Sequence, residues 1–416
     1  MEEARQQGPY VIDSLDGEVT KHEIDTFISG VAAMTIPTSQ WAGGTHNLLA
    51  DGEGGLTLEG INDLYTVAAE IPGLGVERMQ LLNLGVKWND AWLSHRNDQP
   101  LGEHRVMWTG KVEPVWPPDA PPSQYAGCEV GDTVGHLAYT ALNIVSTPSI
   151  WNETVPDGDP HHFGVSYLER AKTYVTMSEF SMSTFFTKNF IDPATHEIRP
   201  PASNEWVKQN ENVDAWNRQM MFLHAYQTLG QIHQVLKDDA ALAALYKSIV
   251  TVSTDAFVKN AQPRKAPDGT PVYDWGYGNM GDVKERLIGE STGHGQYDIW
   301  GLTRAYRAGY TNATRQQMKT YADTVAHVIR LGNDSYADTV DRSGRESRPS
   351  NYLYQGYFYL SPYNPEIYKP AASAAIAARV QSTSAGMTAT ILWAKHALNG
   401  PTRERSAPPS LSTALS

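Results

Sequence analysis

Apolar residues recur every three or four positions along most of this 416-residue chain, and this spacing restricts the fold more than any other feature. Between residues 232 and 249, for example, Ile232, Val235, Leu242, Leu245 and Ile249 follow the helical period. Patterns that alternate apolar and polar residues, as half-buried strands require, are nearly absent from the sequence. The spacing therefore predicts an all-α protein in which each helix buries one stripe against its neighbours.

We predict helices over residues 58–70, 76–97, 133–146, 165–188, 213–235, 240–260, 295–308, 313–331 and 370–398. Loops rich in Pro, Gly and aromatic residues lie between them, at residues 110–127, 151–164, 190–206, 262–284 and 341–368. Loops of this length in a compact helical domain usually carry function. We therefore expect the functional residues in these loops and in the helix ends beside them.

Two distant stretches share the pattern Gly-His-x-x-Tyr. It occurs in GCEVGDTVGHLAY, residues 127–139, and again in GESTGHGQYD, residues 289–298. Each opens a predicted helix, which indicates repeated helical hairpins. A closed ring of six or seven hairpins is an (α/α) toroid, although an open solenoid would show the same pattern. We predict one toroid domain over residues 1–400 and a flexible, Pro/Ser-rich tail over residues 401–416.

Charge and composition exclude several classes of partner. The formal net charge of −13 disfavours general nucleic-acid or membrane-surface binding, because those partners are anionic too. We find no apolar run that we expect to span a bilayer, and the single cysteine, Cys128, excludes an intramolecular disulfide. Glycosylation sequons at Asn152, Asn312 and Asn333 favour secretion, with a leader that this sequence lacks. We expect a secreted monomer.

Four segments together carry a family resemblance: WTGKVEPVWPP, YAGCEVGDTVGHLAY, NENVDAWNRQMMFLHAY and GESTGHGQYD. They resemble the (α/α)-toroid polysaccharide lyases of uronic-acid polymers, and are most similar to polysaccharide lyase family thirty-eight, the glucuronan and alginate lyases. The similarity covers roughly residues 58–398. It implies cleavage of a (1,4)-linked anionic polysaccharide by β-elimination, without a metal or another cofactor. That reaction neutralises the uronate carboxylate, removes H-5 and protonates the departing O-4.

The resemblance implies roles for residues in the last two segments. Tyr297 is the expected proton donor, and a neighbouring Arg or protonated His is expected to lower its pKa. His224 or His294 is the expected base. Asn217 lies seven positions before His224, two turns along one helix face, so both can point inward. Arg286 is expected to reach the carboxylate or the phenolate.

Glu290 completes the predicted catalytic set, since it shares one helix face with His294 and Tyr297 if that segment is helical. The residues predicted to bind substrate come from the first motif and from an aromatic, basic loop: Glu129, Asp132, His136, Arg345, Arg348, Tyr352 and Tyr354.

Other interpretations stay open. Paired carboxylates, Glu129 with Asp132 or Glu290 with Asp298, suit an inverting glycoside hydrolase on the same fold. A non-catalytic carbohydrate-binding protein would show similar helices and loops. His224 can be a structural histidine in an apolar segment, and Glu290 can simply favour the start of the next helix. We expect no metal site.

Overall fold

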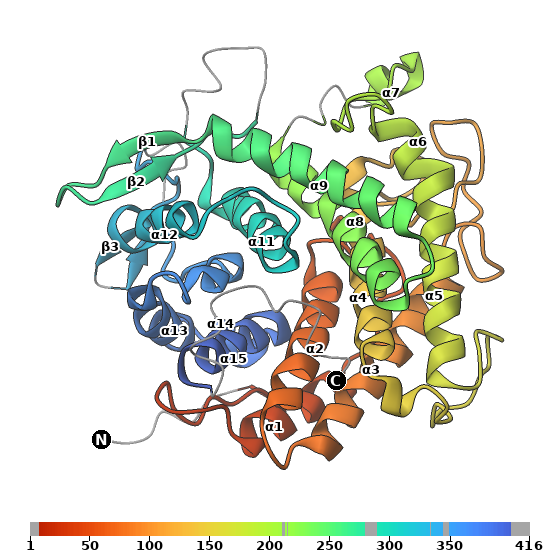
Figure 1. Cartoon of the computed structure of the whole chain (residues 1–416), viewed down its shortest axis with the longest axis horizontal. Coiled ribbons are helices and arrows are strands. Elements are labelled where there is room, and N and C mark those ends of the chain that lie inside the picture. Colours follow the sequence, from red (N-terminus) through yellow and green to blue (C-terminus); the bar gives the residue numbers. More distant parts are fainter. Residues whose placement is uncertain are drawn as a thin grey trace.

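The computed structural model describes residues 8–209, 213, 215–278, 289–332, 334–343 and 349–400. Within these residues, six inner segments form a ring, namely α2 (Glu53–Glu70), α4 (Gly131–Val145), α8 (Trp216–Leu236), α11 (Thr292–Ala308), the 3-10 helix η5 (Gln355–Leu360) and α15 (Ala385–Asn399). Each packs against the next, and α15 packs against α2, so the ring closes (Figure 1). The predicted all-α (α/α) toroid is confirmed.

Outer helices lie between the inner ones along the chain: α1 (Lys21–Ala32), α3 (Gly75–Ser94), α5 (Tyr167–Ser181), α9 (Ala240–Asn260), α12 (Arg315–Thr324) and α13 (Tyr368–Ala377). Because the chain goes out and back in each hairpin, the inner helices begin at one end of the barrel and end at the other. We call these ends the N-terminal mouth and the C-terminal mouth.

Short elements complete the described chain. The helical pieces are η1 (Cys128–Val130), η2 (Pro148–Ile150), η3 (Met182–Phe186), α6 (Thr187–Phe190), α7 (Asn204–Gln209), η4 (Val325–Ile329), η6 (Pro365–Ile367) and α14 (Val380–Thr383). Two small antiparallel hairpins pair β1 (Gln262–Lys265) with β2 (Pro271–Asp274), and β3 (Arg330–Gly332) with β4 (Ser335–Tyr336). Neither hairpin contributes to the inner ring.

Helix ends differ from the predictions where side chains cap the backbone. The segment 370–398, predicted as one helix, is divided into α13, α14 and α15. Arg379 adopts a left-handed conformation there, with φ of 62°, and the Ser384 side chain caps α15. Helix α11 begins at Thr292 rather than at 295, because the Ser291 hydroxyl accepts a hydrogen bond from His294 N. Helix α1 was not predicted, and Thr20 and Glu23 form its capping box.

The two ends of the described chain meet in the ring. Lys395 on α15 donates to both carboxylate oxygens of Glu23 on α1, at 2.8 and 2.9 Å, and both side chains are fully buried. Figure 1 shows the last helix (blue) beside the first two (red and orange). This ion pair joins the N-terminal and C-terminal helices of the barrel.

Helix α9 corrects one expectation from the sequence. By length and composition it could cross a membrane, and it is the single such helix in the described part of the chain. It forms part of the outer layer of the barrel, where it packs against α8 through a stripe that includes Tyr246, Ile249, Val250 and Phe257.

Candidate active site

Most long connections of the toroid gather at the N-terminal mouth. Their described residues include 33–52, 95–127, 191–209, 261–278, 330–332, 334–343 and 349–354, and precede α2, η1 with α4, α8, α11 and η5. At the other end the turns 71–74 and 237–239 are short and one connection, 146–166, is long. The inner helices also point the positive ends of their dipoles toward this mouth. The side chains of these loops and helix starts therefore form the candidate functional site.

Tyr297 lies on α11 at this mouth, half-buried, with its ring stacked on Trp300 at a centroid distance of 6.2 Å. Its hydroxyl donates to the main-chain oxygen of Asp51 over 2.9 Å. The pKa of Tyr297 was predicted to be lowered, and this expectation is wrong. Burial raises the pKa well above its ordinary value, and the negative charges of Asp51 and Asp132 raise it further. The phenol thus keeps its proton at neutral pH.

Two carboxyl groups beside Tyr297 have opposite pKa shifts. Burial, the charge of Asp132 and that of Glu129 together raise the pKa of Asp51 to about 7. Burial acts in the same direction on Asp132, but the charges and hydrogen bonds of His136, His224 and Arg304 outweigh it and hold that pKa well below its usual range. One carboxyl is poised to hold a proton near neutral pH while its neighbour is ionised, which is the arrangement that acid–base catalysis uses.

Asp132 belongs to a buried ionic layer that crosses the barrel interior. Its Oδ1 lies 2.8 Å from Nδ1 of His224 and 3.7 Å from Nη1 of Arg304. Arg304 in turn bonds Oε1 of Glu59 through Nε at 3.0 Å and Nη2 at 2.8 Å. His136 links the same two acids, with Nδ1 3.0 Å from Glu59 and Nε2 3.5 Å from Asp132. The layer joins α2, α4, α8 and α11.

The two histidines of this layer differ in charge. Burial lowers the pKa of His136, but the charges and hydrogen bonds of Asp132 and Glu59 outweigh this effect. Together they raise the pKa to about 9, so the ring is a cation. Its Nε2 also lies 2.9 Å from the carbonyl oxygen of Ala50, next to Asp51. For His224, burial and the charge of Arg304 lower the pKa to about 4, which leaves it neutral. His136 therefore supplies fixed positive charge beneath the Asp51 loop.

Glu59, His136 and His224 also offer ligand atoms within 4.8 Å of one another, close enough to share a metal ion. Arg304 already places a positive charge on Glu59, and both nitrogens of His136 have acceptors. These contacts account for the grouping as an ionic layer, with His136 and Arg304 as its cations.

The first motif places Glu129 at the start of α4, beside the mouth, where its side chain is buried. Its Oε1 accepts a hydrogen bond of 2.6 Å from the Tyr125 hydroxyl, and its Oε2 is buried with no hydrogen-bond partner among the described residues. Arg218, Tyr125 and Gln209 line an open hollow of about 550 Å³ beside it. Asn217, next along α8, is buried, and its Oδ1 lacks a hydrogen-bond partner within the described chain.

The remaining predicted residues spread around this mouth. Glu290 is buried just before the Ser291 cap, outside the helix, and His294 is exposed with its Nδ1 3.7 Å from Glu290. Glu290 therefore does not lie on the helix face that His294 and Tyr297 share. Tyr354 lies against Gly293 at the start of α11, and its ring contacts that of Tyr352 at 5.5 Å. The predicted Arg286, Arg345 and Arg348 lie outside the described residues.

Sequence reasoning missed Asp51, Glu59, Arg304 and Arg218. Arg304 lies seven positions after Tyr297, the same spacing that was used to pair Asn217 with His224, so helical spacing could have found it. Asp51 ends the loop before α2, and only the fold brings it beside α4 and α11.

No protein-family model matches the chain, and the comparison with curated proteins found no match. Among solved structures, it is similar to a possible member of the GH105 family from Salmonella enterica serovar Paratyphi A. The two chains share 12% sequence identity with a TM-score of 0.42, over 91% of this chain and 94% of that chain. A similarity at this level does not bear on activity.

Proposed function

We propose that the N-terminal mouth hydrolyses a glycosidic bond in an acidic saccharide. The observation that carries this proposal is the pair Asp51 and Asp132, whose pKa values are moved in opposite directions. A carboxylic acid that stays protonated near neutral pH can donate a proton to the departing sugar oxygen. Asp132, held ionised by its cationic neighbours, keeps the proton on Asp51 through its negative charge.

Glu129 is the proposed base. Tyr125 fixes one of its carboxylate oxygens and leaves the other without a partner, so that oxygen can take a proton from an attacking water. The proton balance closes, since Asp51 gives one proton to the leaving oxygen and Glu129 receives one from water. This assignment keeps the sequence-based pairing of Glu129 and Asp132 but moves the acid to Asp51.

The acidic character of the substrate is inferred from Arg218. This guanidinium lines the open hollow next to Glu129, together with the Tyr125 ring and the Gln209 amide. Planar guanidinium groups bind carboxylates through paired hydrogen bonds, and aromatic rings pack against sugar faces. A uronic-acid residue would satisfy both, in a chain whose net charge is otherwise strongly negative.

A β-elimination of a uronic-acid polymer is the second candidate, and Tyr297 favours it. Its phenol is protonated and half-buried at the same mouth, as a proton donor to O-4 requires. The two reactions leave different products. Elimination creates an unsaturated, ultraviolet-absorbing end for each bond cleaved, whereas hydrolysis creates a new reducing end without that absorbance.

The test incubates the protein with glucuronan, alginate blocks, pectate and glycosaminoglycans, and follows reducing ends and ultraviolet absorbance together. Reducing ends without absorbance support hydrolysis, and equal amounts of both support elimination. Binding of these saccharides without either product would instead identify a non-catalytic carbohydrate-binding protein and reject both enzymatic candidates.

A further inference from the structure

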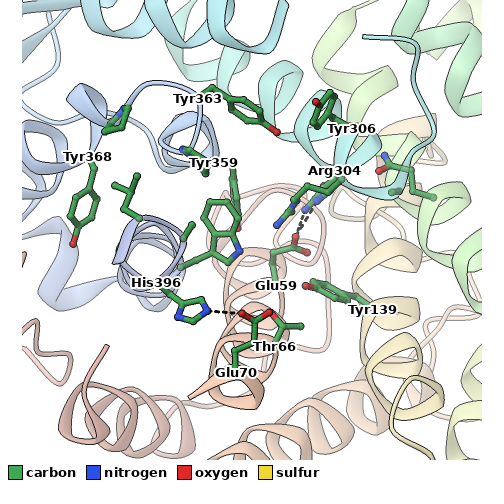
Figure 2. Close-up of a pocket in the computed structure, with 18 of the residues that line it drawn as sticks. Glu59, Thr66, Glu70, Tyr139, Arg304, Tyr306, Tyr359, Tyr363, Tyr368 and His396 are labelled. Atoms are coloured by element: carbon green, nitrogen blue, oxygen red, sulfur yellow. Dashed lines mark hydrogen bonds and ion pairs between the residues drawn. The ribbon is translucent and has the colours of Figure 1, made fainter. Parts of the chain in front are cut away.

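A cavity of about 1100 Å³ lies in the barrel at the C-terminal mouth, opposite the candidate active site. Most of its lining residues come from the C-terminal halves of α2, α4, α8, α11 and α15 and from residues 359–370, and Glu59 and His224 line its inner end. Figure 2 shows Arg304 paired with Glu59 in its wall, so the ionic layer separates this cavity from the N-terminal mouth.

Arg307 offers unused hydrogen-bond donors in this cavity. Its guanidinium lies over the rings of Tyr359 and Trp393, at 5.1 and 5.0 Å from their centroids. Asp63 is the acid whose charge acts most strongly on Arg307. Its carboxylate already accepts hydrogen bonds from the hydroxyls of Tyr139 and Tyr359. Within the described chain the Arg307 side chain makes no hydrogen bond or ion pair, so a ligand carboxylate can take up its donors.

Gln227 on the neighbouring helix α8 provides a second, independent sign of a ligand. Its side chain is 2% exposed and lines the cavity, and neither amide atom has a hydrogen-bond partner among the described residues. A buried amide without partners destabilises a protein unless something else satisfies it. An incoming hydroxyl group could bond to both its nitrogen and its oxygen.

The other walls suit a saccharide. Flat aromatic faces come from Tyr306, Tyr363 and Trp393, and Arg330 adds further positive charge. Three acids line the cavity: Glu59 is paired with Arg304 and Glu70 with His396, and Glu366 shares the lining with the cations Arg315, Arg330 and Lys369. Aromatic rings, open guanidinium donors and an open amide together match a ring with hydroxyl and carboxylate groups.

We propose that the C-terminal mouth is a second binding site, for a carboxylate-bearing oligosaccharide, formed by Arg307, Gln227 and the aromatic wall. The site lies apart from the proposed acid and base, so the inference does not depend on which reaction the N-terminal mouth performs. A ligand at this site would also satisfy the buried Gln227 amide, which has no hydrogen-bond partner among the described residues.

Replacing Gln227 by Met tests the proposal, because Met has a similar volume and no hydrogen-bonding group. Titration calorimetry with oligoglucuronate and oligogalacturonate, on an Asp51→Asn background that prevents turnover by the proposed acid, should show binding at this cavity whether or not the N-terminal mouth also binds. Gln227→Met should weaken the binding at this cavity about tenfold. Arg307→Met should weaken the same site at least as much. Thermal unfolding without ligand should show Gln227→Met as stable as the parent or more stable.

Gln40→Met is the matched control for stability, since the Gln40 amide bonds Thr133 and Leu49 and its loss should lower the melting temperature. A Gln227→Met variant that loses stability but keeps the binding of the parent would overturn the proposal, as would binding that neither Gln227→Met nor Arg307→Met weakens. Equal competition by inorganic phosphate, or equal binding of a neutral oligosaccharide, would overturn the ligand class. These measurements follow binding and stability and do not use enzymatic activity. A negative result would therefore reject the second binding site without rejecting the proposed hydrolysis.

Discussion

Tyr297 is joined to Asp51 by a hydrogen bond of 2.9 Å from the phenol to the main-chain oxygen. This contact ties helix α11 to the residue before the Gly52 cap of α2, and it holds a protonated phenol beside the proposed acid. The phenol has a different role in each candidate reaction. In hydrolysis it only positions Asp51, whereas in elimination it donates the proton to the leaving oxygen.

Replacing Tyr297 by Phe should separate those roles. In hydrolysis, loss of the bond to Asp51 should cost about 1 kcal/mol of stability and lower kcat by about tenfold or less. In elimination, kcat should fall at least about a hundredfold in a folded protein that still binds oligouronates. Steady-state kinetics with both product assays, together with thermal unfolding, measures the difference. The His224→Ala and His294→Ala variants show whether either predicted histidine assists.

Replacing Asp51 by Asn should remove the proposed acid while keeping its shape. We expect hydrolysis to fall at least about a hundredfold, because Asn cannot give up a proton to the leaving oxygen. Near-normal turnover in this variant would reject Asp51 as the acid. Glu129→Gln is the parallel test of the base, and Asp298→Asn, at a buried carboxyl that accepts a hydrogen bond from Trp275 Nε1, is the matched control.

Stability should respond to pH through the same carboxyl. Asp51 has a folded pKa of about 7, above its unfolded value, so the folded state binds more protons between these values. Its contribution to the free energy of unfolding should therefore fall as pH rises from about 4 to about 7. The difference between wild type and Asp51→Asn in urea unfolding should shift in favour of Asn over this range. A constant difference would contradict the raised pKa.

Hydrolysis should show the matching activity profile. Since the proposed acid must be protonated, kcat/KM should decline above pH of about 7, where Asp51 loses its proton. A pH series in buffers of constant ionic strength measures this limb. Undiminished activity two pH units higher would be inconsistent with Asp51 as the acid.

The sequence predicted the barrel better than the site. The helical spacing in segments such as 240–260 is local, so it identified helices and the class of fold without knowledge of their partners. Ring closure depends on non-local contacts such as Lys395 with Glu23, which lie 372 positions apart. Glu290 is missing from the predicted helix face with His294 and Tyr297, because the Ser291 cap starts the helix after Glu290.

Charge states were the least predictable part of the site. His136 was predicted to bind substrate and His224 to act as a base, and the sequence predicted the charge of neither; in the structure one is cationic and the other neutral. Both histidines face the acids Glu59 and Asp132. For His136 the two acids outweigh burial, whereas for His224 burial and the charge of Arg304 outweigh the same acids. Those neighbours come from other helices, so no local pattern records them.

Replacing His136 by Gln should destabilise the ionic layer in a pH-dependent way. Its folded pKa of about 9 lies above the ordinary 6.5, so its stabilising contribution is complete below about 6.5 and is lost as pH rises through about 9. At pH 6 we expect a loss of about 3 kcal/mol, because Glu59 and Asp132 lose a buried cation. In chemical unfolding, the difference in the free energy of unfolding between wild type and His136→Gln should become smaller toward pH 9. His22→Gln, at an exposed histidine paired with Asp13, controls for loss of a surface ion pair.

Replacing Lys395 by Met should weaken the contact between the inner helix α15 and the outer helix α1. The substitution leaves Glu23 buried without its cation, and breaking one partner of a buried ion pair typically costs about 3–5 kcal/mol. Glu23 keeps hydrogen bonds from Asp13 N and Thr20 N, so removing its charge as Glu23→Gln in the same protein should recover part of that loss. Urea unfolding of the two single variants and the double variant gives the coupling energy. Additive losses of stability would show that the ion pair does not hold α1 and α15 together. A double variant more stable than Lys395→Met alone would show that the unpaired charge of Glu23 causes most of the loss of stability.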